Sequence, residues 1–238
     1  MPNPRIFLSS DLAPNFEIRL TASQHHYLVK VLRQNNGDTI KVFNTKKEFN
    51  AVITCTKPNL IIKLTTEEQN ISISNPLKIH LYQALLRSKK MDLIVQKATE
   101  LGVIAITPMI TARCQVRECP EKKLFRWQDI AIHASQQSQQ QLVPQINDPI
   151  KLENIKITND SFDIALIPSA NSGLKSKMCL NKNINIFIGP EGGFSAAEED
   201  YFTRNDTTLI KFGPRILRTE TAPIAVIAAI NALWGDSG

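Results

Sequence analysis

The sequence predicts an α/β protein preceded by a smaller β domain, and three observations lead to that class. From residue 77 onward, apolar runs of strand character alternate with helical segments, which is typical of a largely parallel sheet. Residues 1–70 instead carry five short strand-like runs separated by turn residues. Near the C-terminus, two glycine-cornered loops each follow a predicted strand. Such loops gather at the ligand-binding edge of α/β sheets.

The first domain, residues 1–70, is predicted to be a compact β-barrel with one helix over residues 22–32, capped by Thr21 or Ser23. Its predicted strands cover residues 6–8, 16–20, 39–43, 49–55 and 60–64. Such a barrel can bind RNA, and the chain has a net charge of +6 with a pI near 9.2. The available side chains are Arg5, His25, His26, Lys30 and Arg33. The same residues also fit an ordinary solvated helix face.

A polar linker over residues 71–76 leads into the second domain, residues 77–238. Its predicted strands cover residues 77–84, 103–107 (stopped by Pro108), 162–167 and 184–188, and its predicted helices residues 91–101 and 121–140. The short apolar strands are of the kind that parallel sheets bury on both faces. We therefore expect the strands from residue 77 onward to lie in one sheet.

The C-terminal stretch contains the chemistry-bearing loops. The first loop runs from Gly189 to Gly193, and Ser195 with Glu198 predicts a capping box at the helix that follows. A strand over residues 208–212 leads to the second loop, Gly213 to Thr221. The first loop lacks the glycine and lysine spacing of phosphate-binding loops. Its glycines would let the backbone approach a ligand, although a plain turn is the alternative.

The second loop carries charges beside an apolar helix that is predicted over residues 222–234. Arg215, Arg218 and Glu220 stand between an apolar strand and this helix. Charges in such places are usually paired or functional, because an unpaired charge is costly to bury. An ion pair between Arg218 and Glu220 is one interpretation, and a catalytic role is the other.

Composition excludes several classes. The N-terminus has no apolar signal core, and the longest apolar run is too short to span a bilayer, so a soluble cytoplasmic protein is expected. The four cysteines, Cys55, Cys114, Cys119 and Cys179, have neither metal-ligand spacing nor the density of a disulfide framework. We expect no metal.

Four segments carry a family resemblance. IGPEGGFSAAEED (residues 188–200) and FGPRILRTETAPIAVIAAI (residues 212–230) closely resemble the SPOUT superfamily of RNA methyltransferases, and within it the ribosomal RNA small subunit methyltransferase E family. HHYLVKVLRQNNGDTI (residues 25–40) looks like that family's PUA-like domain, and MDLIVQKATELGV (residues 91–103) like its first methyltransferase helix. The resemblance covers nearly the whole chain.

One segment departs from the family pattern. Where the family shows A-x-E-Q-x-G-R-x-x-V-P, this chain has glutamines in place of the acid, the glycine and the arginine, namely Gln136, Gln139 and Gln140. The family's glutamine is retained as Gln137, and its Val-Pro as residues 143–144. These substitutions would change individual contacts to RNA or to a partner subunit, and the expected activity stays the same.

The resemblance implies a SPOUT-type trefoil-knotted domain that uses S-adenosyl-L-methionine to methylate N3 of one specific uridine in 16S rRNA of the 30S subunit. It also implies a homodimer, for which the apolar C-terminal helix is the expected face. The implied cofactor-binding residues are Leu166, Ile167, Pro168, Ile188, Gly189, Pro190, Gly192, Gly193, Phe212, Gly213, Ile216, Leu217, Thr221 and Ala222. Arg218 would stabilise charge on the uracil carbonyls, and Glu220 or Glu191 would orient it or accept the proton.

Arg87 and Lys89 would lie near the RNA cleft and join the basic residues of the first domain. Two other functions stay open. One is a SPOUT methyltransferase that acts on ribose 2′-O or on tRNA, and the other is a non-catalytic RNA-binding protein with a relic pocket.

Overall fold

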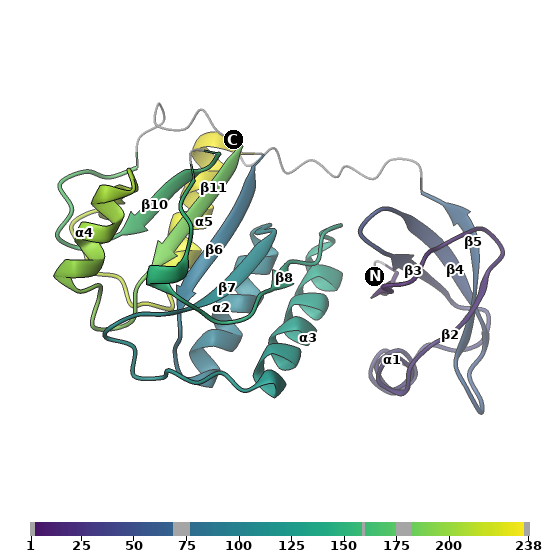
Figure 1. Ribbon diagram of the computed structural model, residues 1–238. Helices are drawn as coiled ribbons and strands as arrows, with labels where there is room; N and C mark the ends of the chain where they lie inside the picture. Colours follow the sequence, from purple (N-terminus) through teal and green to yellow (C-terminus); the bar gives the residue numbers. More distant parts are fainter. Residues whose placement is uncertain (1–2, 69–76, 159, 175–181, 236–238) are drawn as a thin grey trace. The chain divides into compact units, whose positions relative to one another are not determined.

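The computed structural model describes residues 3–68, 77–158, 160–174 and 182–235, and the predicted linker, residues 71–76, lies outside them. The chain forms two compact units. The N-terminal unit comprises Met1–Ile73 together with Ser135–Leu142, and the α/β unit comprises Ser74–Ala134 and Val143–Gly238. Figure 1 gives the element labels used below.

The N-terminal unit is built on a five-stranded sheet in the order β1-β3-β4-β5-β2. The strands are β1 (Arg5–Phe7), β2 (Glu17–Arg19), β3 (Thr39–Phe43), β4 (Glu48–Cys55) and β5 (Ile61–Glu67). β1 runs parallel to β3, and the other pairs are antiparallel. Alternate residues of β3 and β4 point into a core that includes Leu28, Ile40, Val42 and Ile62. All five predicted strands are present.

The predicted helix over residues 22–32 is regular only at its start. Thr21, one of the two caps that the sequence allowed, closes a capping box with Gln24 at the N-terminus of α1 (Ala22–His25). The chain then widens into the π-helical segment His26–Val31, and its cap, Leu32, donates its N–H to the Tyr27 carbonyl five residues back. Helical periodicity alone does not distinguish this wider turn from an α-helix.

Ser135–Leu142 contributes to the N-terminal unit although it lies far along the chain. Arg5 is buried there, and its Nε and Nη2 donate to Glu48 Oε2 at 2.9 and 2.6 Å. Its Nη1 donates to the Ser135 and Gln140 carbonyls, and its Nη2 also donates to Gln141 Oε1. All five guanidinium N–H groups therefore have protein acceptors. Arg5 is not available for the RNA contact that the sequence suggested.

The α/β unit is built on a seven-stranded sheet in the order β12-β10-β11-β6-β7-β8, with β9 also paired to β7. The strands are β6 (Lys78–Ala84), β7 (Ala105–Ile110), β8 (Gln145–Ile146), β9 (Ile150–Lys151), β10 (Phe162–Leu166), β11 (Asn183–Ile188) and β12 (Thr208–Ile210). Every pair is parallel, as predicted. A short 3₁₀ turn, Leu152–Asn154, follows β9.

Pro108 does not stop β7, contrary to the sequence expectation, because the strand continues to Ile110. The first part of β7 pairs with β8 through Ala105 and Ile106, and the last part pairs with β9 through Met109 and Ile110. Pro108 falls between these two short pairings. A residue without an N–H is tolerated there because the ladder on that edge is already interrupted.

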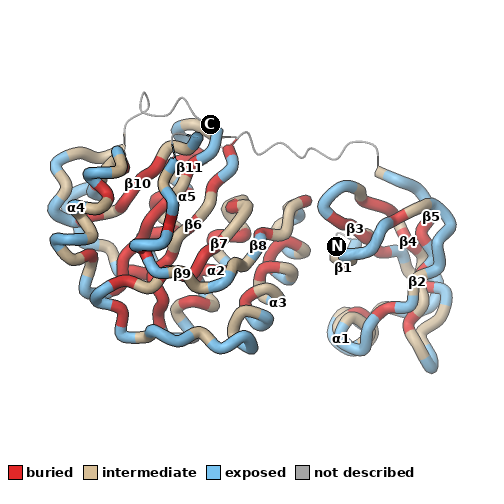
Figure 2. The backbone as a smooth tube through the Cα atoms, viewed as in Figure 1, coloured by how far each residue is buried: buried red, intermediate tan, exposed pale blue. Residues whose placement is uncertain are grey.

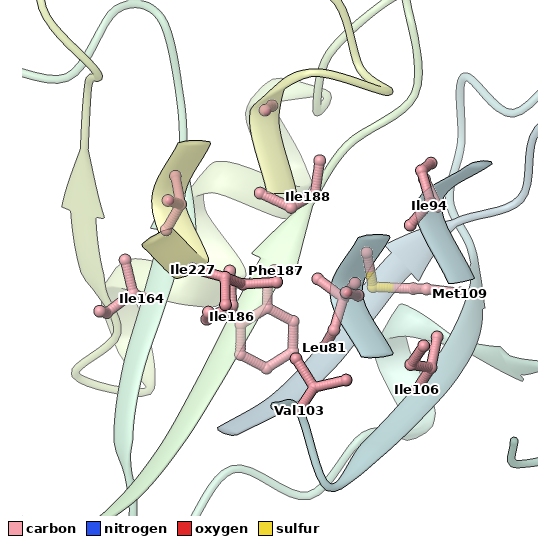
Figure 3. Close-up of a cluster of buried hydrophobic side chains, with 14 of the residues drawn as sticks. Leu81, Ile94, Val103, Ile106, Met109, Ile164, Ile186, Phe187, Ile188 and Ile227 are labelled. Atoms are coloured by element: carbon pink, nitrogen blue, oxygen red, sulfur yellow. The ribbon is translucent and has the colours of Figure 1, made fainter. Parts of the chain in front are cut away.

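Helices cover both faces of the sheet (Figure 1). They are α2 (Ser88–Glu100), α3 (Glu121–Ser138), α4 (Ala196–Arg204) and α5 (Ala222–Trp234). Ile227 of α5 lies by Ile164 and Ile186 in the core (Figure 3). The next residue of β11, Phe187, points to the other face, where its ring lies 5.2 Å from that of Phe202 in α4. The strands are accordingly buried along most of their length (Figure 2).

Candidate functional site

A pocket of about 220 Å³ lies at the carboxyl ends of β10, β11 and β12, on the edge of the sheet where the sequence placed the glycine-cornered loops. The predicted cofactor-binding residues that line it are Leu166, Pro168, Ile188, Gly189, Pro190, Gly193, Phe212, Gly213, Ile216, Leu217 and Ala222. The loops after three neighbouring strands therefore come together as one concave surface.

Three residues of the predicted set do not line this pocket. Ile167 is 2% exposed and belongs to the core. Gly192 lies against the Arg113 side chain, and Thr221 occupies the N-cap position of α5. The pocket also has five lining residues that were not assigned to the cofactor. They are Lys211, Pro214, Arg215 and Thr219, together with Glu191, for which a catalytic role was predicted.

Thr219 connects the two loops. Its Oγ1 donates to the Gly189 carbonyl at 2.7 Å, and Gln83 Nε2 approaches the same Oγ1 at 3.5 Å. Thr219 and Gln83 are buried, so these contacts are shielded from water. This contact joins the segment before α5 to the loop after β11. The polar Thr219 between charged neighbours in the sequence was the signal that could have identified it.

Glycine is required at two corners of the pocket. Gly193 has φ of +67°, and Gly213 has φ of +69°. L-residues adopt this left-handed region at a cost of roughly 1–2 kcal/mol, whereas glycine enters it freely. The backbone turn in each loop therefore depends on the glycine at that position.

Arg113 fixes the shape of the first loop from outside. It lies in the segment after β7, and its Nη1 donates to the Gly192 and Phe194 carbonyls at 2.8 and 2.9 Å. The helix that follows begins with the predicted capping box, in which Ser195 Oγ accepts from Glu198 N and Glu198 Oε2 accepts from Ser195 N. Glu198 Oε1 also accepts from the Ala112 N–H. The first loop is thus held on both sides by the segment after β7.

The three predicted catalytic residues lie at or beside the pocket. Glu191 lines it, and Lys90 of α2 approaches Glu191 Oε1 at 2.8 Å and Glu220 Oε2 at 3.3 Å. Arg218 is exposed, and within the described residues it does not pair with Glu220. The partner of Glu220 is Lys90. The sequence did not reveal Lys90 because its two carboxylate partners lie more than 100 residues further along the chain.

The pKa values of Glu191 and Lys90 are both shifted. The hydrogen bond from Lys90 lowers the pKa of the Glu191 carboxyl, and burial works against this shift. The hydrogen bond to Glu191 likewise raises the pKa of the Lys90 ammonium. Both shifts favour the charged forms, so Glu191 stays a carboxylate beside an ammonium.

The residues predicted to contact RNA differ in exposure. His26, Lys30 and Arg33 are exposed and His25 is partly buried, all around the helical segment of the N-terminal unit. Arg87 and Lys89 are exposed at the start of α2 in the other unit.

The described residues contain neither a membrane-spanning helix nor a metal-binding cluster. None of the helices there is both long and apolar enough to cross a membrane. No group of three or more His, Cys, Asp or Glu side chains in the same residues could hold a metal ion, and Cys179 lies outside them.

Comparison with known proteins first gives the class. Residues 74–231 match the family described as an RNA methyltransferase domain, and residues 20–65 match the family described as an RNA methyltransferase PUA domain. The first match covers most of the α/β unit together with Ser135–Leu142, and the second lies within the N-terminal unit.

Relatives then give the particular family. The chain is 35% identical to ribosomal RNA small subunit methyltransferase E of Buchnera aphidicola, with 98% of this chain and 97% of the relative covered. It is 33% identical to the protein of that name from Bacillus subtilis, with 92% and 90% covered. The solved structure of the Neisseria gonorrhoeae protein of that name, bound to S-adenosyl methionine, superposes with a TM-score of 0.91 at 31% identity, covering 99% and 100%. This chain belongs to the ribosomal RNA small subunit methyltransferase E family. The predicted fold class, a SPOUT α/β domain with a PUA-like domain, is confirmed.

Proposed function

We propose that this protein transfers a methyl group from S-adenosylmethionine to N3 of one specific uridine in 16S rRNA. The observation that carries the proposal is the pocket formed by the three loops at the carboxyl edge of the sheet, with the carboxylates Glu191 and Glu220 beside it. The bound cofactor in the Neisseria gonorrhoeae structure supports the choice of cofactor.

The residues of the pocket fit such a cofactor. Ile216 lines the pocket but is 82% exposed, which leaves an apolar surface that a planar adenine ring would cover. Gly189, Gly193 and Gly213 bring backbone close to the cavity, so backbone N–H and C=O groups would bind the polar atoms of the base and ribose. An Ile216→Asp change should therefore weaken cofactor binding without affecting the core.

The chemistry requires a proton to leave uracil N3. S-adenosylmethionine supplies a methyl group that is already activated by its sulfonium. The protein must therefore orient the base in line and deal with the N3 proton. Glu220 and Glu191 are the carboxylates beside the pocket, and the exposed Arg218 guanidinium would stabilise negative charge on the flanking carbonyl oxygens.

The role of Arg218 has a direct test. Arg218→Ala should lose at least about 100-fold in methyl transfer, which is the usual effect of removing one group that stabilises transition-state charge. Cofactor affinity, measured by calorimetry, should stay at the wild-type value because the Arg218 side chain does not line the pocket. Wild-type turnover in this variant would contradict the assignment.

RNA would be held by phosphate contacts from both units. Lys30 and Arg33 are exposed in the N-terminal unit, and Arg87 and Lys89 are exposed at the start of α2, where helix N–H groups also favour anions. Neutralising each pair should weaken RNA binding and reduce its salt dependence. An unchanged salt slope in both double variants would exclude these residues from the interface.

A homodimer belongs to the same proposal. The exposed positions of α5 include Ala228, Ala232 and Leu233, and α5 contains no charged residue along Ala222–Trp234. An uncharged apolar helix face is typical of subunit interfaces. Sedimentation should give a dimer for the wild type and a smaller species for Leu233→Glu.

Since 16S rRNA is the proposed substrate, we also propose a cytoplasmic location.

The decisive experiment is methyl transfer with labelled S-adenosylmethionine to 16S rRNA and to 30S particles that lack the modification, followed by nucleoside mass spectrometry. 3-Methyluridine at a single site would support the proposal. Label in 2′-O-methylribose would support a methyltransferase of the same fold that acts on ribose instead of on uracil N3. Cofactor binding without transfer to any of these RNAs would contradict the proposal.

A further inference from the structure

Lys90 contacts two of the predicted catalytic residues, Glu191 and Glu220, although the sequence predicted no role for it. It is the third residue of α2, and its ammonium reaches the loop after β11 and the loop before α5. Glu191 Oε1 lies 2.8 Å from Nζ and Glu220 Oε2 lies 3.3 Å from it. Three segments that are distant in sequence therefore meet at one nitrogen atom.

The start of α2 is electrostatically unfavourable for a helix. Arg87 occupies the N-cap position with no side-chain cap, Lys89 and Lys90 follow in the first turn, and that turn has no acidic residue. Cations near a helix N-terminus oppose the macrodipole by about 0.3–1 kcal/mol each. When a helix N-terminus departs from this charge preference, the departure often marks a functional site, where another interaction offsets the cost. For Lys90, the offsetting interaction is the pair of carboxylates.

Glu220 depends on Lys90 more than Glu191 does. The Glu220 side chain is 16% exposed, against 41% for Glu191. Its Oε2 is enclosed and accepts no well-formed hydrogen bond among the described residues, so the charge that faces it is the Lys90 ammonium. Without Lys90, this carboxylate would lie near the Glu191 carboxylate with no counter-ion between them. Two carboxylates that share a site do not both stay ionised easily.

We infer that Lys90 is a positioning residue for the proposed methyl transfer, holding Glu191 and Glu220 together at the edge of the pocket so that an ionised carboxylate faces the acceptor base. The inference rests on the proposed function. Lys90 acts through the two carboxylates and does not itself touch the reacting atoms.

The charges around the cluster define what a pH experiment would report. Lys90 and Arg87 face Glu191 from the start of α2, and Arg113 holds the adjacent backbone at Gly192. Arg218 precedes Glu220 in the same loop and is exposed. Lys90 contacts both carboxylates, and its hydrogen bond is the largest cause that lowers the pKa of Glu191, so its removal should raise that pKa more than removal of the neighbouring arginines.

The test compares Lys90→Met, which keeps the length of the side chain and removes its charge, with Lys97→Met. Lys97 lies on the same helix and pairs with Glu100 at 2.8 Å, so it is a matched control for loss of a surface ion pair. Lys90→Met should lower kcat about 100-fold, the usual effect of misplacing a catalytic group. Cofactor affinity should stay near wild type, and Lys97→Met should behave as wild type.

The pH dependence distinguishes positioning from general damage. In Lys90→Met, the acidic limb of the kcat profile should move upward by roughly one pH unit, since a carboxylate that has lost its counter-ion holds its proton more tightly. Lys90→Arg, which keeps the charge, should restore most of the activity. Adding Glu191→Gln to Lys90→Met should return the acidic limb toward wild type, because one of the two like charges is removed.

Two results would overturn the inference. Lys90→Met with the wild-type kcat and pH profile would show that the cluster has no role in the reaction. Equal losses in Lys90→Met and Lys97→Met, in step with a lower melting temperature, would show a structural role only. If the wild type transfers no methyl group to any form of 16S rRNA, it is the proposed function that fails. ¹³C NMR titration of the two carboxyls would then show whether Lys90 still controls their ionisation.

Discussion

Gln139 has a backbone conformation that L-residues adopt at a cost. It follows the last residue of α3, Ser138, and its φ is +61°. Glycine is the usual residue at this position after a helix, because it enters the left-handed region without a steric penalty. The sequence pattern of the family also has glycine here. The predicted helix over residues 121–140 ends two residues early for this reason.

Replacing this residue gives the first prediction. Gln139→Gly should raise the free energy of unfolding by about 0.5–1 kcal/mol, since relief of the left-handed strain exceeds the entropy that glycine adds to the unfolded chain. Gln137→Gly is the control, because residue 137 lies within α3, where glycine should cost a similar amount. Urea unfolding followed by circular dichroism measures both. A less stable Gln139→Gly variant would show that the glutamine side chain contributes more than the strain.

His80 gives a second prediction, on the acid stability of the α/β unit. It lies on β6 with Nε2 2.7 Å from Thr107 Oγ1 and its ring stacked on Tyr82. Burial lowers the pKa of His80 to about 4 from 6.5. Below pH 6.5 the unfolded chain therefore binds a proton that the folded protein does not accept until about pH 4. Stability from the neutral imidazole is fully present above pH 6.5 and is lost as the pH falls through this window.

The size of this effect follows from the shift. The loss on going from pH 7 to pH 4 should be about 3 kcal/mol from this group. Both tryptophans of the chain, Trp127 and Trp234, lie in the α/β unit, so their fluorescence reports its unfolding. His80→Gln should lower stability at pH 7 and lose less stability than the wild type between pH 6.5 and 4. Parallel curves for the two proteins across that range would contradict the lowered pKa.

At the scale of elements, the start of α4 shows how one side chain connects two segments. Glu198 Oε2 completes the capping box with Ser195, and Oε1 accepts the Ala112 N–H at 2.7 Å from the segment after β7. Glu199 is also in the first turn, and it has the same favourable interaction with the helix dipole. The two glutamates therefore differ in their backbone contacts rather than in their charge.

This difference makes the third prediction. Glu198→Ala should destabilise the α/β unit by about 1–2 kcal/mol, the usual cost of losing a cap together with a second charge-assisted hydrogen bond. Glu199→Ala should change stability by less than about 0.5 kcal/mol. Tryptophan fluorescence in urea gives both values. Equal effects would mean that the charge at the helix N-terminus, not the capping box, stabilises this element.

Elements set by local signals were predictable. The capping box of α4, the longer apolar strands and the glycines at the loop turns were recognised, because each depends on residues within a few positions. β8 and β9 were missed because two-residue strands have no periodicity, and their pairing with β7 gives them their form. Pro108 was misinterpreted because its tolerance depends on the gap between those two partners.

In the candidate site too, the features set by nearby residues were predictable and those set by the tertiary fold were not. The loops that line the pocket are visible in sequence, since Gly193 and Gly213 mark turns that only glycine adopts easily. The partners of those loops are not visible, because Lys90, Gln83 and Arg113 reach them through the tertiary fold. Arg5 is the opposite case. A basic residue near the N-terminus of an RNA-binding domain suggested phosphate contact, and only the structure shows that its five N–H groups all donate to protein acceptors.

At the scale of the whole molecule, the N-terminal unit is discontinuous. Ser135–Leu142 belongs to it, although residues on both sides belong to the α/β unit. Gln136 Oε1 accepts the Phe7 N–H, and Gln141 Nε2 donates to the Asn44 carbonyl at 2.5 Å. A cut near residue 70, where composition alone divides the chain, would therefore remove the partners of this segment. The glutamine run is a structural part of the N-terminal unit.

The final prediction follows from this discontinuity. In a fragment of residues 77–238, the amides of Ser135–Leu142 should exchange with solvent much faster than in the full chain, because the groups of residues 5, 7, 44 and 47 that bind this segment are absent. The amides of β6 and β11 should keep their protection, since their partners all lie within the fragment. Hydrogen exchange with mass spectrometry measures both regions in one experiment. Full protection of Ser135–Leu142 in the fragment would show that the segment is held by the α/β unit, and loss of protection throughout would show that the fragment does not fold alone. The expected result also means that RNA binding by the N-terminal unit should be tested with surface variants such as Lys30→Ala and Arg33→Ala, because truncation changes the remaining unit as well.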